Sequence, residues 1–582
     1  MSANKIVIKL SRGLIVIIGL GLLINPAYSQ AIEDDSSDET RSGGVVRPGN
    51  TPLQTTPAQD EKDTPSPIDI KIKEIIDKKA RVAYGPKFFI KEIKVSGNTA
   101  FTNEELKKIT APYENRVVYN SELEDIRLAL TRKYIKQGYI NSGAIIPDHK
   151  VVDGVVHFSI IEGKLTDINV VGNNYINTDY IKESLKLGAE IPLNVNVLQE
   201  QIKRMLKSPS ISTINSALRP GDRRGEASLT ALIKEGPRVE FKPVIDNRIS
   251  PTLGSFRTLY PIQINSLVGQ GDTLNLSFGQ AEGLNDGSLN WAIPTVRGTT
   301  LNIFGSYSDS KIVYGSFKDL DIANHAQTFG FKVTTPVSNS TKNNLNLSWS
   351  MEVRKNASEL LGQEYAFSSG VPADGKVNAT VIRFSQDWTS RGQNNIFAAR
   401  SLFNLGINAF GATINDNSTP SGEFFSWLGQ IQWAKLLNED MGQVIFRVNG
   451  QLTKDALFGM EQYSIGGALS VRGYRENQLV RDNGYGVSLE YRYPLLKDAN
   501  GKSILTLAPF YDAGGSSNNK RSDGTAPTFI SSVGIGFRWN PVKKINAQLY
   551  WGHALNKVVN DGESLQDDGY HFLLSANLTE WL

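Results

Sequence analysis

The 582-residue chain has no cysteine, few histidines and almost no net charge. Without cysteine, an exported chain has neither a disulfide framework nor thiolate chemistry. A net charge of +3 gives no argument for nucleic-acid binding. No Gly-x-x-x-x-Gly-Lys-Ser/Thr motif and no Gly-x-Ser-x-Gly elbow occurs, and the histidines lack metal-ligand spacing. We therefore expect no enzyme, no cofactor, no metal site and no nucleic-acid partner.

Long apolar runs are also scarce. After the first 29 residues no stretch is long enough to form a transmembrane helix, and the mean hydropathy is −0.27. This excludes a helical membrane protein. A membrane β-barrel remains possible, because its strands alternate lipid-facing and lumen-facing residues, so that the mean hydropathy of the chain can equal that of a soluble protein. The 52 Gly, 24 Phe, 20 Tyr and 8 Trp suit many turns and two aromatic girdles.

The N-terminus predicts export. Residues 1–29 read as a cleaved signal peptide, with basic residues before an apolar stretch at 14–24 and small residues at Ala27-Tyr28-Ser29. A membrane anchor is the alternative, but the stretch is shorter than the roughly 20 residues that a span needs. Residues 30–67 are predicted to be a Pro-rich flexible linker. Residues 68–85 predict a short basic amphipathic helix, either a lead-in to the next domain or a plug of a pore.

An internal repeat of two modules follows, at 86–163 and 164–236. The segment 89–98, Phe-Ile-Lys-Glu-Ile-Lys-Val-Ser-Gly-Asn, is echoed at 165–173, and each copy ends a strand in a Gly-Asn turn. Two helical stretches follow in each copy, and each copy closes on two strands that end in Glu-Gly. This β-α-α-β-β order resembles POTRA domains, the periplasmic modules of outer-membrane barrel proteins. An unrelated duplicated α+β module is the alternative.

The modules suggest a mode of partner binding. A small sheet leaves an edge strand to which an extended client can pair. In the first module we expect this strand at 142–151, beside the helix at 121–137. The predicted groove for an unfolded client would use Ser142, Ile145, Val151 and Leu130.

Residues 237–582 predict an all-β domain of sixteen antiparallel transmembrane strands. Segments of about ten residues alternate apolar and polar side chains, which is the period of a tilted membrane strand. We place them at 238–249, 254–267, 271–281, 286–296, 299–309, 326–337, 344–355, 377–389, 395–409, 423–436, 442–454, 484–494, 503–514, 528–540, 543–553 and 569–582.

The connections between these segments alternate in length. Every even-numbered connection is short, whereas the odd-numbered ones include the long loops 310–325, 356–376, 455–483 and 554–568. A membrane barrel with short periplasmic turns shows this parity, and a soluble β-sandwich, the alternative, would not be expected to. A barrel of this size leaves an aqueous channel.

The longest loop carries a motif, Val471-Arg472-Gly473-Tyr474. The following strands contain Glu490-Tyr491-Arg492-Tyr493-Pro494 and Phe510-Tyr511-Asp512-Ala513-Gly514. Together with the two modules, these segments resemble the TpsB transporters of two-partner secretion systems, over residues 88 to 582.

The resemblance implies that the loop folds into the barrel and that Arg472 binds the lumen-facing Asp512. Glu490 and Arg492 are expected as polar residues of the barrel wall. A plain surface loop with an exposed arginine is the alternative. One departure is the end Trp581-Leu582, where such barrels commonly end in an aromatic residue.

The resemblance further implies an outer-membrane transporter that secretes an unfolded partner exoprotein through the barrel, with its N-terminal domains in the periplasm. The barrel-assembly machinery and outer-membrane lipid are expected partners, and the chain is expected to be a monomer. Two other functions stay open: an insertase for other barrels, and a passive solute pore.

Overall fold

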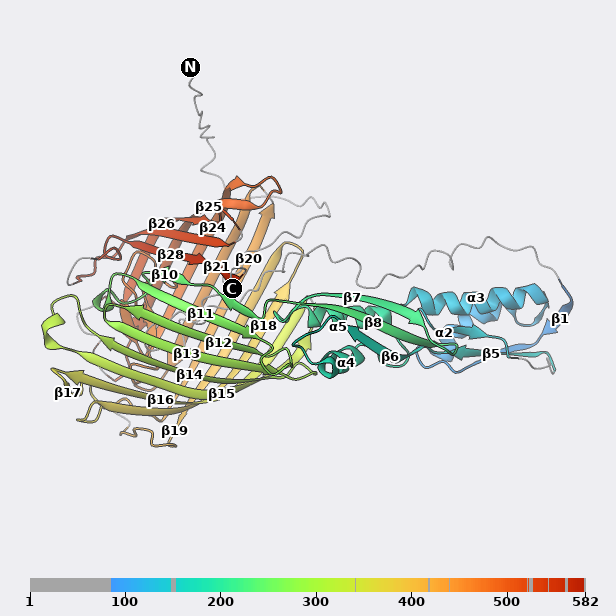
Figure 1. Cartoon of the computed structure of the whole chain (residues 1–582), viewed down its shortest axis with the longest axis horizontal. Helices are drawn as coiled ribbons and strands as arrows, with labels where there is room; N and C mark the ends of the chain where they lie inside the picture. The colour runs from blue at the N-terminus through green and yellow to red at the C-terminus, as the bar shows by residue number, and fades with distance from the viewer. Residues whose placement is uncertain are drawn as a thin grey trace, which may run out of the picture.

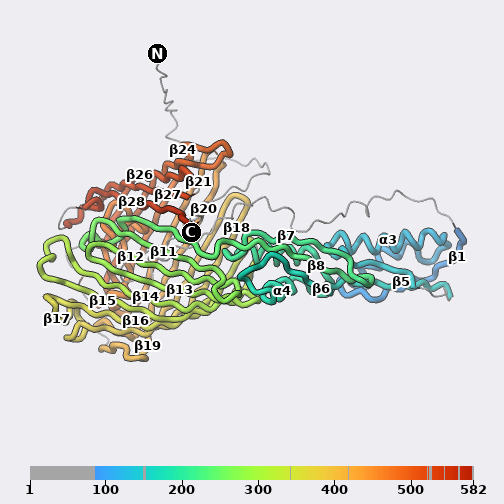
Figure 2. The backbone as a smooth tube through the Cα atoms, viewed as in Figure 1, coloured from blue at the N-terminus to red at the C-terminus, as the bar shows by residue number. Residues whose placement is uncertain are grey.

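The computed structural model describes residues 85–147, 153–340, 342–416, 419–438, 440–520, 522, 527–542, 544–560 and 564–579. The predicted signal peptide, linker and basic helix lie outside these residues, as do Val151 and Trp581-Leu582. Within the described residues, no helix has the length and apolarity to cross a membrane. The chain forms two α+β modules that extend in line from one end of a large β-barrel (Figures 1 and 2).

The first module has two small sheets and two main helices. Its elements are β1 (Lys87–Ile90), β2 (Glu92–Ser96), α2 (Asn103–Thr110), the 3₁₀ turn η3 (Ala111–Tyr113), β3 (Arg116–Tyr119), α3 (Asn120–Lys136), β4 (Gly143–Ile145) and β5 (Val155–Ile161). The main sheet has the order β2-β5-β4, and β1 pairs with β3. The segment 89–98, expected as one strand, is therefore divided between two sheets. The break falls at Lys91, whose N–H donates to the carbonyl of Gly154.

Local sequence explains where the helices begin. Thr102 caps α2 and Glu105 reaches back to the Thr102 N–H, a capping box that satisfies two otherwise unpaired donors. Helix α3 turns its apolar stripe toward the main sheet, where it is buried. That stripe consists of Leu123, Ile126, Leu130 and Tyr134.

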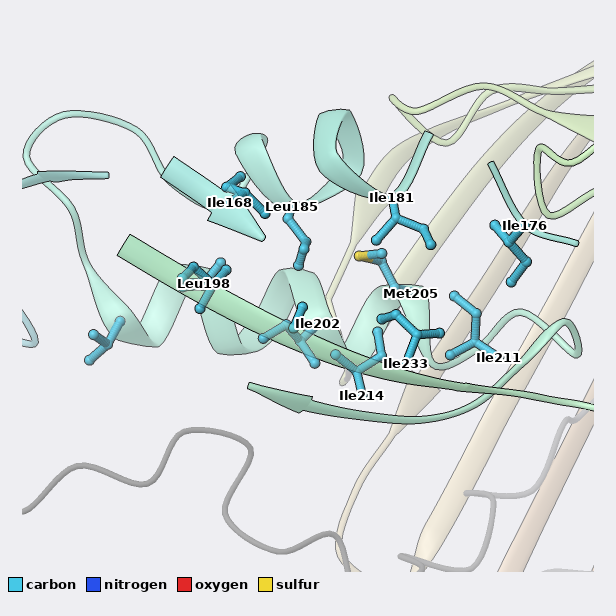
Figure 3. Packing of buried hydrophobic residues seen from close by; sticks show 13 residues of the cluster. Ile168, Ile176, Ile181, Leu185, Leu198, Ile202, Met205, Ile211, Ile214 and Ile233 are labelled. Atoms are coloured by element: carbon cyan, nitrogen blue, oxygen red, sulfur yellow. The ribbon is translucent and has the colours of Figure 1, made fainter. Parts of the chain in front are cut away.

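The second module repeats the plan. It contains β6 (Lys164–Val171), α4 (Thr178–Lys186), α5 (Val195–Met205), β7 (Ile211–Pro220) and β8 (Glu226–Glu235), with the sheet order β6-β8-β7. Its core lies between the two helices and the sheet (Figure 3). Isoleucine is the commonest residue of this core, and four of its seven isoleucines lie on the strands, where β-branched side chains pack well on a pleated surface.

The repeated Gly-Asn and Glu-Gly pairs contact each other within each module. Gly97 has φ +81°, and a Cβ there would stand 2.5 Å from the carbonyl oxygen of Ile160. Gly172 has φ +92° and the same separation from the carbonyl oxygen of Ile233. Only glycine fits this conformation and this approach. Beside each turn a glutamate, Glu162 or Glu235, accepts the backbone N–H groups that follow the turn.

The two modules are joined by hydrogen bonds to backbone carbonyls of the first module. The Val195 N–H, at the start of α5, donates to the carbonyl of Gly138, which follows α3, at 3.0 Å. The Leu193 N–H donates to the carbonyl of Gly163 at 2.7 Å, and Asn194 Nδ2 donates to the carbonyl of Gln137 at 3.0 Å. These bonds hold the two modules as one arm.

In the described residues the barrel has sixteen antiparallel strands, the predicted number. The first is interrupted, as β9 (Val239–Phe241) and β10 (Val244–Asp246), because Pro243 has no N–H for the ladder. The others are β11 (Arg257–Asn265), β12 (Thr273–Ala281), β13 (Leu284–Pro294), β14 (Thr300–Lys311), β15 (Ala323–Asn339), β16 (Asn343–Leu360), β18 (Lys376–Arg391), β19 (Asn395–Ile407), β20 (Phe424–Asn438), β21 (Gly442–Thr453), β24 (Asn483–Lys497), β25 (Ser503–Ser517), β26 (Phe529–Trp539), β27 (Ile545–Ala554) and β28 (Tyr570–Ala576).

Pairing of β10 with β28 closes the barrel, and each other strand pairs with its neighbours in the chain, the short β17 (Gln363–Glu364) being an extra hairpin on β16. The last predicted segment, 569–582, is too long: β28 ends at Ala576, where the Asn577 N–H turns to the carbonyl of Lys544. Alternate side chains, including Phe278, Phe329 and Trp349, are exposed on the outer surface.

The short turns and the modules lie at the same end of the barrel. In the second module, the Asn177 N–H donates to the carbonyl of Gly269 in the β11–β12 turn at 2.8 Å. Lys207 Nζ donates to Asn339 Oδ1 at the end of β15 at 3.3 Å. The long connections are at the other end (Figure 1). This agrees with the predicted parity.

Candidate functional site: the loop inside the barrel

The long connection between β21 and β24 folds inward and is buried against the barrel wall. It contains a small hairpin of β22 (Tyr463–Ile465) and β23 (Leu479–Arg481). Val471, Tyr463 and Ile465 from this connection pack with Leu428 of β20 and Ile530 of β26 in one apolar cluster. A surface loop would leave such side chains in water, so this arrangement rules out the alternative of an exposed loop.

Arg472 lies at the centre of the site. Its Nε donates to Asp512 Oδ2 at 2.8 Å, and its Nη2 donates to Asp512 Oδ1 at 3.0 Å. The Arg472 backbone N–H adds a third bond to Asp512 Oδ2 at 3.1 Å. Parallel bonds of this kind match the planar guanidinium to the planar carboxylate.

A second carboxylate also holds Arg472. Nη1 donates to Glu490 Oε2 on β24, and Arg492 Nε donates to the other oxygen of Glu490 at 2.6 Å. The guanidinium carbon lies 3.7 Å from the ring centroid of Phe510 and 4.8 Å from that of Tyr550, so two aromatic faces flank the cation. The four charges of this group are each at most 5% exposed.

Burial decides how firmly the loop is held. Removing one partner of a buried ion pair typically costs about 3–5 kcal/mol, because the other charge is left uncompensated. Exposed pairs contribute about 1 kcal/mol or less. Arg472 therefore belongs to the strong class of contact, and it joins the loop to β24 and β25.

The other residues of the motif position the arginine. Gly473 has φ +89°, and a Cβ on it would meet the carbonyl oxygen of Gly552 at 2.7 Å, so both the conformation and the approach to β27 require glycine. The Gly473 N–H donates to His571 Nε2 on β28 at 3.2 Å. The Tyr474 hydroxyl donates to the carbonyl of Ser531 on β26 at 2.9 Å.

A second ionic contact holds the beginning of the loop to a different part of the wall. Glu461 is 1% exposed, and its carboxylate accepts hydrogen bonds from Arg354 of β16 at 2.6 Å and from Arg383 of β18 at 3.0 and 3.1 Å. Arg354 also donates to the carbonyl of Met460 at 2.9 Å. Next to it, apolar loop residues pack against β18 and β20. These are Leu457, Phe458 and Met460. The loop is therefore attached by buried ions at two places.

The predicted groove of the first module looks different in the structure. Leu130 is fully buried in the core, and Ser142 is 4% exposed with its hydroxyl accepting the Gly163 N–H at 2.8 Å. Neither side chain lines an open groove, because both face the interior. Of the segment expected as a strand at 142–151, the structure has β4 at Gly143–Ile145, with Ile145 half-buried at the sheet edge. Val151 lies outside the described residues.

The sequence predicts Asp512 as the partner of Arg472, but it does not predict that Glu490 also binds Arg472. It also does not predict the contact of Glu461 with the barrel wall. The alternation along β24 puts Glu490 on the same face as Ser488, whose register partner is Asp512, and this was a usable signal for Glu490. Glu461 had none, because a residue in a loop has no periodicity from which its neighbours follow.

The fold and the site define an outer-membrane β-barrel transporter with periplasmic modules. Residues 225–539 match the family described as haemolysin secretion/activation protein ShlB/FhaC/HecB, and residues 88–163 match the POTRA domain, ShlB-type. The first match spans more than half of the chain. The protein belongs to this family of outer-membrane secretion transporters, which export partner exoproteins. The insertase and passive-pore alternatives are less well supported.

Known relatives are distant in sequence. The heme/hemopexin transporter protein HuxB of Haemophilus influenzae (strain 86-028NP) is 22% identical over 474 residues, which cover 80% of each chain. The outer membrane transporter CdiB of Escherichia coli is 24% identical over 447 residues, 69% of this chain and 68% of the relative.

Solved structures share the fold. CdiB from Escherichia coli superposes with a TM-score of 0.64 at 20% identity, covering 87% of this chain and 93% of that one. BamA from Haemophilus ducreyi lacking POTRA domains 1–3 gives a TM-score of 0.52 at 15% identity, covering 84% and 100%.

Proposed function

We propose that this transporter takes up its partner exoprotein as an extended segment on the edge strands of its two modules and passes it through a barrel whose inner loop is fixed by Arg472. The observation that carries the proposal is the buried group of Arg472, Asp512 and Glu490, which ties a loop residue to the lumen wall.

The edge strands supply a binding surface with little specificity for the sequence of the client. β4 stands at the edge of the first sheet and β7 at the edge of the second. Strand addition uses backbone hydrogen bonds, so many client sequences can pair there. β7 has ten residues and β4 has three, so the second module offers the longer edge.

The surface of the barrel supports one further partner, the outer-membrane lipid. The outer side chains of the strands include many exposed aromatic residues, which suit lipid and the membrane interface. We propose that the chain works as a monomer in the outer membrane and that the barrel-assembly machinery inserts it.

The test is a secretion assay with the partner exoprotein, comparing the intact chain with a variant that lacks residues 88–162. We expect no secretion from the variant while heat-modifiable, folded barrel is still found in the outer membrane. Normal secretion by the variant would show that the first module is not needed for uptake.

A further inference from the structure

The lumen wall differs in chemistry from one side to the other. On β12 to β15 the residues Ser277, Ser288, Ser306 and Thr328 are consecutive register partners, so they form one row of hydroxyl groups across four strands. Asn275 and Asn290 are partners in the next row, which continues with Phe304 and Gly330, and Asn302 lies one row further on, as the partner of Lys332. We call this surface, defined by these seven residues, the uncharged wall.

The other side of the lumen is ionic. From β18 to β26 the strands carry Arg383, Asp387, Arg400, Arg447, Glu490, Arg492, Asp512 and Arg538 with buried or half-buried side chains. Among the described residues, the lumen-facing positions of β12 to β15 include two charges, Asp286 and Lys332.

The anchored loop occupies the ionic side. Arg472 holds it to β24 and β25, Gly473 and Tyr474 hold it to β26, β27 and β28, and Glu461 holds it to β16 and β18. The strands β12 to β15 take no part in these contacts. Six of the seven side chains of the uncharged wall are half-buried rather than covered, Ser277 being the buried one.

The uncharged wall also lies above the place where the second module meets the barrel. The Asn177–Gly269 hydrogen bond reaches the turn before β12, a Cβ on Gly271 in that turn would lie 3.3 Å from the Tyr180 ring, and Lys207 contacts the end of β15. A segment released from the second module would thus enter the lumen beside β12 to β15.

We propose that the exported polypeptide runs in extended form along the uncharged wall while the loop stays anchored on the ionic side. This rests on the proposed function and adds the surface that the passing chain contacts. Hydroxyl and amide groups both donate and accept hydrogen bonds, each worth about 1 kcal/mol net, so they can replace one another along a moving backbone. Fixed charges would hold or repel charged side chains much more strongly at low dielectric.

Because the chain has no cysteine, single-cysteine variants can test the path without background. We choose Asn302→Cys on the uncharged wall and Gln443→Cys on β21 as its matched control. Both are half-buried amide side chains near the start of a strand at the module end of the barrel. The probe is an unstructured Gly-Ser-Asn peptide of about 20 residues with one central cysteine, long enough to span a lumen about 25 Å tall at about 3.3 Å per residue.

The full chain in liposomes is mixed with the peptide on the module side under mild oxidation, and the disulfide cross-link is measured over time. We expect several-fold faster cross-linking at Asn302→Cys than at Gln443→Cys. Equal rates, or a faster rate at Gln443→Cys, would overturn the path.

Secretion in cells gives a second readout. Asn302→Lys, which places a second cation beside its register partner Lys332, should reduce secretion of the partner exoprotein several-fold, and Asn302→Ser should not. Normal secretion by Asn302→Lys would also overturn the path, while export itself would stand. If the unaltered chain exports no partner, the proposed function fails, whatever the cross-links show.

Discussion

The buried arginine allows a quantitative prediction about how long the loop stays inside the barrel. Arg472→Ala leaves Asp512, which is 0% exposed, without the cation that donates to both its oxygens, while Glu490 keeps Arg492. At about 3–5 kcal/mol for a broken buried pair, the ratio of inward to released loop should fall by about 10²-fold or more.

The assay uses Val471→Cys, which replaces a fully buried residue of the motif in a chain without other cysteines. The rate at which a membrane-impermeant thiol reagent labels this residue reports how often the loop leaves its site. Arg472→Ala should raise the rate by about the same 10²-fold factor. Arg472→Lys should raise it too, because an ammonium group cannot form the two parallel hydrogen bonds.

Asp512→Ala alone should raise the labelling rate less than Arg472→Ala, since Glu490 still holds the arginine. The double variant should label no faster than Arg472→Ala, because both changes break one contact. Arg400→Ala, which removes a lumen arginine paired with Asp387 and not with the loop, is the matched control and should change nothing. Rates that multiply in the double variant would refute the reasoning, and secretion should fall in step with loop release.

Four further predictions follow from other parts of the molecule. Glu461→Gln should increase single-channel conductance in planar bilayers, because the neutral amide no longer compensates Arg354 and Arg383 and the start of the loop is released; unchanged conductance would contradict this. Deleting residues 88–162 should abolish secretion and leave the barrel inserted, as a secretion assay with membrane fractionation would show. Deleting residues 68–82 should change conductance if that segment plugs the pore, and an unchanged value excludes the plug. Burial raises the pKa of Glu162, but hydrogen bonds from Thr99, Ala100 and Tyr134 outweigh this effect and hold the pKa below its usual value. The ionised carboxylate therefore stabilises the first module above a pH of about 4.3, and this stabilisation is lost as the pH falls further. Glu162→Gln should weaken the acid dependence of hydrogen-exchange protection at Thr99 and Ala100, and an unaltered acid dependence would contradict this prediction.

The strands of the barrel could be predicted because one face meets lipid and the other meets water, which imposes a period of two on the sequence. The same alternation placed Asp512 on the lumen side. The loop contacts were harder, because the approach of Glu461 to Arg354 and Arg383 depends on how a long connection folds back, and no local rule sets this. The groove residues were misplaced for a simpler reason: Leu130 belongs to the apolar stripe of α3, and such a stripe packs on its own sheet rather than facing a client.

The hydrogen bonds between the two modules join them into one arm, and the length of this arm bears on how long an extended client would have to be. Helix α3 alone has 17 residues, a rise of about 25 Å at about 1.5 Å per residue. An extended client needs about eight residues to run beside it. The Gly138–Val195 and Gly163–Leu193 hydrogen bonds hold the second module next to the first. If a client pairs along the modules as proposed, its extended tract must therefore be longer than the eight residues or so that pass the first module, because the second module still separates it from the barrel.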